Sequence, residues 1–298
     1  MKRSPRLHGI IPPICTLVDA RERVDEAAMR RLVEHLLKGG VHGIFVMGTT
    51  GEFALLSDEE RRRGVEIVVD AVKGRVPVLA GASAESTKKA LAAAEAATEA
   101  GADILVLSPT YYLPPTQREI LVHFRTFLKH VDLPCVAYNI PWCHATSIAV
   151  ETAAELLAMP GVIGMKDSSE NWAFFQRLLP VKEEAGAVLF QGSEDNAAVS
   201  FLMGADGGVP GIGNVIPAHC VKIYEAAKRG EVKKVRELNA RLQRVRRTYS
   251  LAPVRLILKY MLSLLGIGSG KGVQPSEALP REVKRTIEQT LRNEGFLD

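Results

Sequence analysis

A lysine stands at the end of an apolar run. Residues 162–165 (Val-Ile-Gly-Met) lead directly into Lys166 and Asp167. Such a run predicts a buried strand, and burial disfavours the charged form of a lysine and so lowers its pKa. A neutral amine is the nucleophile that forms a Schiff base with a carbonyl substrate. The residues alone leave two other interpretations open: a lysine that extends into solvent, or one that pairs with Asp167.

Two threonines lie between glycines in the segment Gly48-Thr49-Thr50-Gly51-Glu52. Backbone N–H groups and hydroxyls in a turn of this kind suit a carboxylate or a phosphate. An ordinary surface turn has the same composition, so this segment alone does not define a binding site.

Tyrosines follow two further apolar runs. Tyr111 and Tyr112 come shortly after residues 103–107, and Tyr138 ends the run 134–138. Tyrosines at strand ends often serve only to pack their rings against the core. Because these tyrosines share a rim with the two threonines, their hydroxyls favour a proton relay.

Small residues end the last two runs, as Gln191-Gly192-Ser193 and Gly207-Gly208-Val209. Glycine at such a place lets a ligand approach main-chain atoms closely. The adjacent glycines Gly39-Gly40 and Gly207-Gly208 are too short a pattern to cradle a dinucleotide. The chain contains neither a P-loop nor a Rossmann glycine pattern.

The candidate residues must be positioned by a repeating unit in which a helix ends at a glycine and a short apolar run follows. This alternation predicts parallel strands. Eight repeats over about 230 residues favour a closed (β/α)8 TIM barrel over an open doubly wound sheet, with the active site at the carboxyl ends of the strands. The expected strands are 8–17, 42–47, 76–80, 103–107, 134–138, 162–166, 187–191 and 206–209.

The expected helices divide the chain into two parts. After residue 230 the alternation stops, so we expect residues 1–230 to form the barrel with the active site and residues 231–298 to form a helical appendix packed on it. The expected helices are 25–38, 57–73, 84–100, 116–129, 150–158, 170–179, 194–203, 216–229, 231–249, 252–265 and 281–294.

Composition is that of an ordinary globular protein, with 47% hydrophobic and 24% charged residues and a net charge of +4. Residues 221–298 hold 17 Lys and Arg against 8 Asp and Glu, a balance of +9. These charges lie at helical spacing among Leu and Val and are typical of solvated helix faces, so we expect no nucleic-acid partner. No apolar run approaches the length of a membrane span, so we expect no membrane partner.

Four cysteines show neither a CxxC pattern nor metal-ligand spacing, which predicts reduced thiols, a cytoplasmic protein and no metal site. The start of the chain, Lys2-Arg3 and the run from Gly9 to Val18, faintly resembles a signal peptide. Pro12 and Pro13 interrupt that run and no cleavage pattern follows, so we do not expect a leader.

Taken together, the motifs resemble the dihydrodipicolinate synthase / N-acetylneuraminate lyase family of class I aldolases over nearly the whole chain. The resemblance implies a TIM barrel with a helical C-terminal appendix, a Schiff-base mechanism with pyruvate or a related 2-oxo acid, no metal or organic cofactor, and a homotetramer built as a dimer of dimers. The motifs that carry it are Gly48-Thr-Thr-Gly-Glu52, Tyr111-Tyr112, Tyr138-Asn139-x-Pro141 and Gly164-Met165-Lys166-Asp167.

The resemblance also implies a role for each residue. Lys166 would form the Schiff base, and Thr49 and Thr50 would hold the carboxylate of the 2-oxo acid. Tyr138 would be the general acid/base at the reacting carbon, with Thr49 passing protons. Tyr112 is similar to a catalytic tyrosine that family members insert into a neighbouring subunit's site. Main-chain groups of Gly192 and Val209 would complete the pocket.

One segment departs from the family pattern. Authentic dihydrodipicolinate synthases carry an arginine after the Tyr-Asn-x-Pro motif, which binds the carboxylate of aspartate semialdehyde. Here the segment reads Trp142-Cys143-His144, and a cysteine cannot supply a bidentate cation. Cys143 and His144 are therefore candidate substrate contacts, and Trp142 and His144 suit a hydroxylated or aromatic second substrate.

We therefore expect a lyase that makes or breaks a C–C bond next to a 2-oxo acid such as pyruvate, with an aldehyde as partner, or a dehydratase that uses the same imine. One alternative is an authentic dihydrodipicolinate synthase of lysine biosynthesis with an altered second-substrate site. An alternative of another class is a catalytically idle 2-oxo-acid-binding regulator. The set of Lys166, Thr49 and Tyr138 argues against that regulator, because a binding protein needs no nucleophile.

Overall fold

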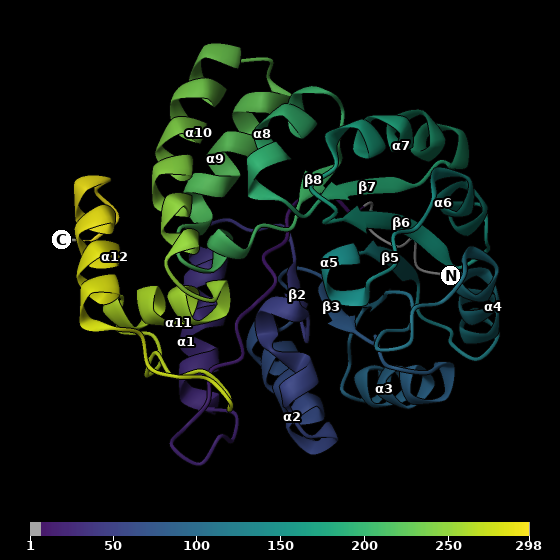
Figure 1. Cartoon of the computed structure of the whole chain (residues 1–298), viewed down its shortest axis with the longest axis horizontal. Helices are drawn as coiled ribbons and strands as arrows, with labels where there is room; N and C mark the ends of the chain where they lie inside the picture. The colour runs from purple at the N-terminus through teal and green to yellow at the C-terminus, as the bar shows by residue number, and fades with distance from the viewer. Residues whose placement is uncertain (1–6, 298) are drawn as a thin grey trace.

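Eight parallel strands form one curled sheet at the centre of the molecule, in the order β1-β8-β7-β6-β5-β4-β3-β2 (Figure 1). The computed structural model describes residues 7–297; Lys2 and Arg3, which we weighed as leader charges, lie outside the described residues. The predicted (β/α)8 fold is confirmed. The strands are β1 (Gly9–Ile10), β2 (Ile44–Val46), β3 (Val78–Gly81), β4 (Ile104–Leu107), β5 (Cys135–Asn139), β6 (Val162–Asp167), β7 (Val188–Gln191) and β8 (Gly207–Gly208).

The first and last strands are far shorter than the expected 8–17 and 206–209. Pro12 and Pro13 have no N–H to donate to a ladder, so β1 ends at Ile10. The gap between β1 and β2 is still bridged by backbone hydrogen bonds: the Phe45 amide donates to the Pro12 carbonyl at 3.0 Å, and the Ile14 amide donates to the Phe45 carbonyl at 2.8 Å. These hydrogen bonds join the two edges of the sheet, although β1 and β2 form no regular ladder.

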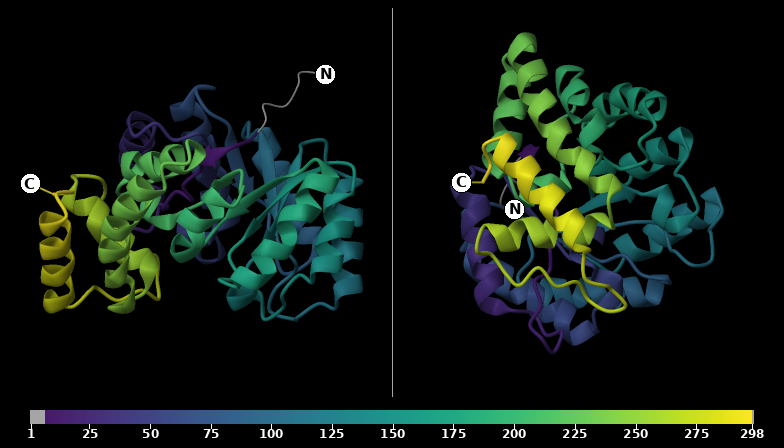
Figure 2. Two further views of the ribbon diagram at one scale, coloured as in Figure 1. Left: turned by 90° about the horizontal axis from the view of Figure 1, so that it is seen from above. Right: turned by 60° about the vertical axis from the view of Figure 1, so that its left-hand side comes forward.

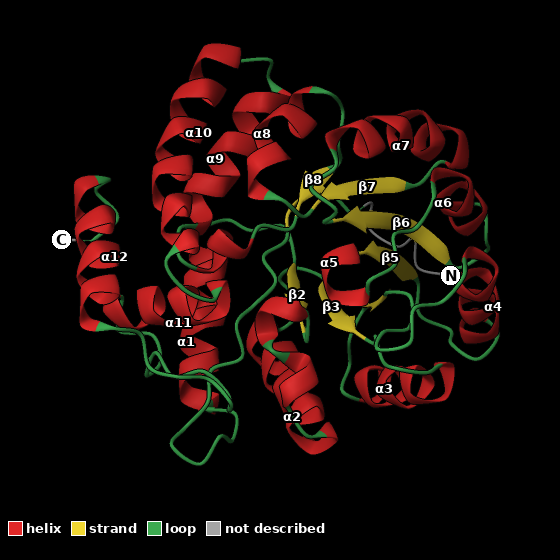
Figure 3. Ribbon diagram, in the orientation of Figure 1, coloured by secondary structure: helices red, strands yellow, loops and turns green. Residues whose placement is uncertain are grey.

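Helices surround the sheet, as Figure 3 shows by colour. Two predicted starts are confirmed: the Ser57 hydroxyl accepts from the Glu60 amide, and Thr116 with Glu119 forms a capping box. The barrel helices are α1 (Glu26–Lys38), α2 (Asp58–Val72), α3 (Thr87–Glu99), α4 (Gln117–Leu128), α5 (Pro141–His144), α6 (Val150–Leu157), α7 (Trp172–Ala185), α8 (Glu194–Leu202) and α9 (Pro217–Lys228), with 3-10 turns η1 (Thr49–Gly51), η2 (Phe53–Leu55) and η3 (Gly211–Asn214).

Two helices differ from expectation. The short helix α5 was not predicted, because its four residues are too few to show a helical period. Helix α7 continues to Ala185 rather than stopping at 179, with Pro180 inside it. A proline inside a helix removes one backbone donor without necessarily ending the helix.

The last part of the chain is helical, as expected. It comprises α10 (Val232–Arg246), the 3-10 turn η4 (Arg247–Ser250), α11 (Val254–Leu264) and α12 (Arg281–Asn293). Helix α10 packs on α8 and α9, α11 contacts η1 and η3, and α12 lies at the edge of the molecule (Figure 2). Because α11 contacts η1, this part of the chain reaches the end of the barrel that carries the candidate site.

Two apolar cores hold these layers. The larger lies between the sheet and the helices, and the smaller fills the inside of the barrel. Phe45, Tyr138 and Phe190 belong to the inner core and come from strands β2, β5 and β7. A Lys166 side chain directed inward from β6 therefore meets aromatic rings. Within residues 7–297, no helix combines the length and apolarity needed to cross a bilayer.

Candidate active site

Lys166 is buried at the end of β6, with 5% of its surface exposed. It is in register with Tyr138 on the neighbouring strand β5, and its Nζ lies 3.9 Å from the centroid of the Tyr138 ring and 5.2 Å from that of Phe45. Burial lowers the pKa of Lys166 to about 7, against a smaller opposing effect of nearby acidic groups, Glu194 foremost. A large fraction of this amine is therefore unprotonated near neutral pH.

The structure supports neither a solvent-exposed Lys166 nor a Lys166 paired with Asp167. The side chain does not extend into solvent. The carboxylate of Asp167 is engaged elsewhere: it accepts from Asn139 Nδ2 at 2.7 Å and from the Ser169 hydroxyl at 2.9 Å. Lys166 thus points into the site as an amine held by aromatic rings rather than by a carboxylate.

Tyr138 brings a hydroxyl to the same place. Its OH lies 3.5 Å from Ser168 Oγ and also hydrogen-bonds the Thr49 side chain. Burial raises the pKa of Tyr138 far above its usual value, with these two hydrogen bonds opposing the change. The hydroxyl therefore stays protonated at neutral pH and is placed to donate a proton.

The Thr49–Thr50 turn forms η1, directly after β2. Glu52 closes the turn in the left-handed region, with φ of 56°, and its carboxylate is fully buried. Arg255 Nε contacts that carboxylate at 3.0 Å, and Lys259 forms a buried ion pair with it. Two cations on one carboxylate leave a positive balance beside the turn, which favours an anion there.

These groups line one cavity of about 330 Å³ at the carboxyl ends of the strands. Of the sequence-predicted residues, it brings together Lys166, Tyr138, Thr49, Thr50, Gly192 and Val209. A Cβ added to Gly192 would lie 2.0 Å from Ser168 Oγ and 3.1 Å from Lys166 Cε. Glycine at 192 therefore keeps the space around the amine open.

Cys143 and His144 do not line that cavity. They border a neighbouring groove, which shares Thr49 and Arg255 with that cavity. The His144 ring stacks on Tyr111 with centroids 5.5 Å apart. Burial raises the pKa of Cys143 to about 11, opposed by a hydrogen bond from Thr49 and by the charge of Lys166. Cys143 thus remains close to the site through Thr49, whereas His144 mainly supports Tyr111.

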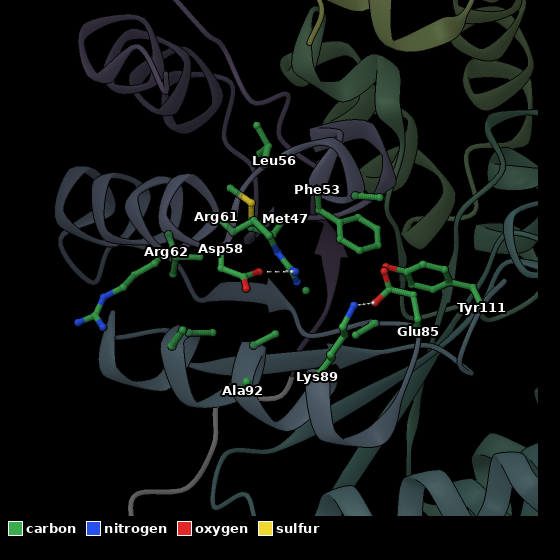
Figure 4. A pocket seen from close by; sticks show the side chains of 17 residues that line it. Met47, Phe53, Leu56, Asp58, Arg61, Arg62, Glu85, Lys89, Ala92 and Tyr111 are labelled. Carbon is green, nitrogen blue, oxygen red and sulfur yellow. Dashed lines mark hydrogen bonds and ion pairs between the residues drawn. The ribbon is translucent and has the colours of Figure 1, made fainter. Parts of the chain in front are cut away.

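The two tyrosines of the 111–112 pair point to different places. Tyr112 is 89% exposed and adopts a φ of 73°, so within one chain it contributes nothing to the Lys166 cavity. Tyr111 borders a second cavity of about 300 Å³ between α2 and α3, where Figure 4 shows it beside Glu85 with Phe53 close by. This second cavity shares no lining residue with the Lys166 cavity.

Sequence reasoning missed several residues of the Lys166 cavity. Glu194 follows Gly192 by two residues, so its place after β7 was a usable signal. Arg246, Tyr249 and Arg255 come from α10, η4 and α11 and gave none, because only the folded chain brings the appendix to the barrel rim. Among residues 7–297, no three His, Cys, Asp or Glu side chains gather as a metal site.

Comparison with known proteins places this arrangement in a family. The model of the dihydrodipicolinate synthetase family matches residues 6–294. The 4-hydroxy-tetrahydrodipicolinate synthase of Parvibaculum lavamentivorans is 36% identical, over 92% of this chain and 94% of the relative. The corresponding protein of Methanopyrus kandleri is 32% identical, over 98% of both chains.

Solved structures agree with this assignment. The dihydrodipicolinate synthase of Bacteroides thetaiotaomicron is 35% identical, with a TM-score of 0.92 over 96% of this chain and 98% of that one. A prophage protein of the dihydrodipicolinic acid synthase family from E. coli K12, solved in complex with pyruvate, is 27% identical, with a TM-score of 0.93 over 97% of this chain and 99% of that one. This chain therefore belongs to the dihydrodipicolinate synthetase family and is a lyase.

Proposed function

We propose that this protein is a class I pyruvate aldolase in which Lys166 forms a Schiff base with the 2-oxo acid. The observation that supports it most is the buried Lys166 amine, which lies against the Tyr138 ring at 3.9 Å and is not held by the carboxylate of Asp167. A desolvated amine beside a protonated hydroxyl is suited to attack a carbonyl carbon. The pyruvate complex of the related prophage protein supports pyruvate as the 2-oxo acid.

The reaction follows from these positions. The Lys166 amine attacks the carbonyl carbon of pyruvate, and loss of water gives the imine. The Tyr138 hydroxyl supplies the proton with which that water leaves, and the resulting phenolate takes a proton from the methyl carbon. The enamine carbon then forms the new C–C bond to the aldehyde carbon. The electron pair of the aldehyde carbonyl passes to its oxygen, which takes up a proton from the Tyr138 hydroxyl. Water hydrolyses the imine and restores the amine; cleavage runs the same steps in reverse.

The carboxylate of pyruvate has a place at the Thr49–Thr50 turn. The positive balance of Arg255 and Lys259 over Glu52 lies directly behind that turn. Hydroxyls and backbone amides with a nearby positive charge are suited to a carboxylate. This assignment places the carboxylate on the side of the cavity that α11 supports.

The assembly and compartment are part of the same proposal. The exposed Tyr112 completes the site of a neighbouring subunit in a homotetramer built as a dimer of dimers. All four cysteines are free thiols, three of them buried, which supports a reducing compartment, the cytoplasm.

Trapping with borohydride tests the imine. Incubation of the protein with pyruvate and borohydride reduces an imine to a stable secondary amine, which peptide mass spectrometry locates. We expect one modified peptide, with the label on Lys166, and none after Lys166→Ala with the fold kept by circular dichroism. Label on another lysine, or no label, contradicts the proposal.

Lysine biosynthesis is the second candidate, because several relatives carry the name 4-hydroxy-tetrahydrodipicolinate synthase. Cys143 argues against it. Of the cations that line the Lys166 cavity, Arg246 pairs with Asp195 at 2.7 Å, and Arg255, which shares Glu52 with Lys259, lies beside the turn assigned to the pyruvate carboxylate. An idle 2-oxo-acid regulator would bind pyruvate without turning over any aldehyde, which product formation separates from an aldolase.

A further inference from the structure

A buried amide–carboxyl pair joins the ends of the neighbouring strands β5 and β6 (Figure 1). Asn139 is in register with Asp167, directly after the register pair of Tyr138 and Lys166. Both side chains are buried, and Asn139 Nδ2 donates to Asp167 Oδ1 at 2.7 Å. Successive side chains of a strand point to opposite faces, so this pair lies on the helix side of the sheet while Tyr138 and Lys166 face the cavity.

The same amide also closes the loop that carries α5. Asn139 Oδ1 accepts from the Ile148 amide at 3.0 Å, nine residues further along the chain. The segment between these two residues contains α5, and Trp142 of α5 lines the Lys166 cavity. One side chain therefore ties β6 on one side to both ends of this loop on the other.

The carboxyl group of Asp167 is held by donors. Besides the Asn139 amide, its Oδ1 accepts from the Ser169 amide at 3.2 Å, and its Oδ2 accepts from the Ser169 hydroxyl at 2.9 Å. An asparagine at position 167 would turn an NH2 group toward one of these donors, so the site requires an acidic side chain. Burying a carboxyl group against neutral donors is costly for stability, which favours a role in the reaction.

Two backbone hydrogen bonds fix the same point of β6. The Ser168 amide donates to the Asn139 carbonyl at 2.9 Å, and the Gly192 amide donates to the Asp167 carbonyl at 2.7 Å. The residue that follows Lys166 is thus tied to β5 on one side and to the end of β7 on the other. This arrangement limits any shift of the Lys166 backbone relative to Tyr138.

We propose that Asn139 and Asp167 are positioning residues, whose hydrogen bond holds the Tyr138 oxygen within reach of the methyl carbon of the Lys166 imine. This inference rests on the proposed imine. Neither side chain lines the cavity, so both act through Tyr138 and Lys166. The step that depends on them is proton transfer between the methyl carbon and the Tyr138 oxygen, because a small misplacement of reacting groups slows such a step strongly. Pyruvate binding at the Thr49–Thr50 turn depends on them less.

Exchange of the pyruvate methyl protons in deuterium oxide, followed by NMR, measures this step without an aldehyde. Borohydride labelling of Lys166 at saturating pyruvate counts the competent sites, so kcat for exchange is expressed per labelled site. Asn139→Asp sets two carboxyl groups against each other, and Asp167→Asn turns an NH2 group toward donors. In each variant we expect kcat per labelled site to fall about tenfold or more, with KM for pyruvate changing less than about threefold.

The double variant tests the pairing itself. Combining Asn139→Asp with Asp167→Asn restores an amide–carboxyl hydrogen bond in the reverse direction, and the new carboxyl group at position 139 still accepts from the Ile148 amide. We expect kcat per labelled site to recover at least about threefold over the lower of the two single variants. Ser169→Ala removes one donor to Asp167 and serves if the single variants do not fold; it should lower kcat about threefold.

Asp206→Asn is the matched control. Asp206 is a carboxyl group at the amino ends of the strands, where its Oδ2 accepts from Lys182 Nζ and from the Leu189 amide, both at 2.9 Å. The control variant should lose stability and keep kcat per labelled site. An unchanged kcat per site in the Asn139 and Asp167 variants, an equal fall in the control, or no recovery in the double variant overturns the inference.

Wild-type protein separates the two levels of the argument. If it is not labelled on Lys166, the proposed function fails, and this inference fails with it. If it is labelled and exchanges the methyl protons, but the variants match it per labelled site, the proposed function stands and only the positioning role is wrong.

Discussion

The chemistry of this protein depends on a lysine made reactive by its surroundings. Lys166 is surrounded by the rings of Tyr138 and Phe45, and burial lowers its pKa from 10.5 to about 7. Nearby carboxyl groups oppose this change without reversing it. The position of the side chain at the end of a barrel strand, more than its residue type, therefore determines its reactivity.

That pKa predicts a pH profile. Protonated Lys166 is inert, so the rate of imine formation with pyruvate should rise about tenfold per pH unit below pH 7 and level off above about pH 8. An ordinary lysine would keep gaining reactivity toward pH 10. The measurement is the rate of borohydride trapping between pH 5.5 and 9, with N-acetyl-lysine amide as the reference amine. A rate that still climbs steeply at pH 9 contradicts the profile.

Cys143 predicts poor use of aspartate semialdehyde. A lost bidentate contact to a carboxylate costs about 2–5 kcal/mol when the charge is left buried and unpaired, or roughly 30-fold to several-thousand-fold in kcat/KM. Pyruvate should still form the imine, whereas condensation with aspartate semialdehyde should be very slow and should rise in Cys143→Arg. The assay couples condensation to the next reductase of lysine synthesis. Ordinary turnover by the unmodified protein would show that another cation binds this carboxylate.

At the scale of elements, α11 holds the turn that carries the threonines. Lys259 and Arg255 on α11 both pair with Glu52, which directly follows η1, and Lys259 and Glu52 are both fully buried. A buried ion pair adds little net stability over apolar replacements, but removing one partner leaves an uncompensated charge. The pair is therefore best understood as a device that positions the turn.

This positioning role predicts that stability and pyruvate binding can be separated by mutation. Lys259→Met should cost about 3–5 kcal/mol of unfolding free energy. Combining it with Glu52→Gln should recover much of that loss, because the buried carboxylate that lost its lysine is then removed as well. Arg255 also loses its partner in the double variant, but its side chain is partly exposed to solvent. The double variant should nevertheless show a raised KM for pyruvate, with a smaller change in kcat. Urea unfolding and steady-state kinetics measure both, with Lys271→Met on the surface as control; an unchanged KM in the double variant contradicts the positioning role.

The sequence predicts elements well where one local signal determines them. Glycine after a helix and an apolar run after the glycine located most strands to within a few residues. Prediction failed at prolines. Pro12 and Pro13 lack the N–H that a strand needs and shorten β1, whereas Pro180 is accommodated inside α7 and does not end the helix. Likewise Lys166 was visible at a strand end, whereas nothing local to Tyr249 indicates that η4 brings it to the cavity.

At the scale of the whole molecule, barrel and appendix build one site. The barrel supplies Lys166, Tyr138 and the threonine turn, and α10 to α11 supply Arg246, Tyr249 and Arg255. We retain the division after residue 230 as a proposal about architecture. The contribution of the appendix to the cavity argues that the two parts do not act separately.

The last prediction concerns assembly. Tyr112 and its neighbour Leu113 are 89% and 75% exposed, an adjacent pair of large apolar side chains of the kind that an interface covers. We expect at least a dimer at micromolar concentration by analytical ultracentrifugation. Leu113→Asp should shift it toward monomer and lower kcat with it, whereas Tyr112→Phe should keep the assembly and lower activity alone. Val122→Asp, at an exposed apolar position on α4, is the matched control and should change neither. A monomeric protein with full activity would show that no neighbouring subunit completes the site.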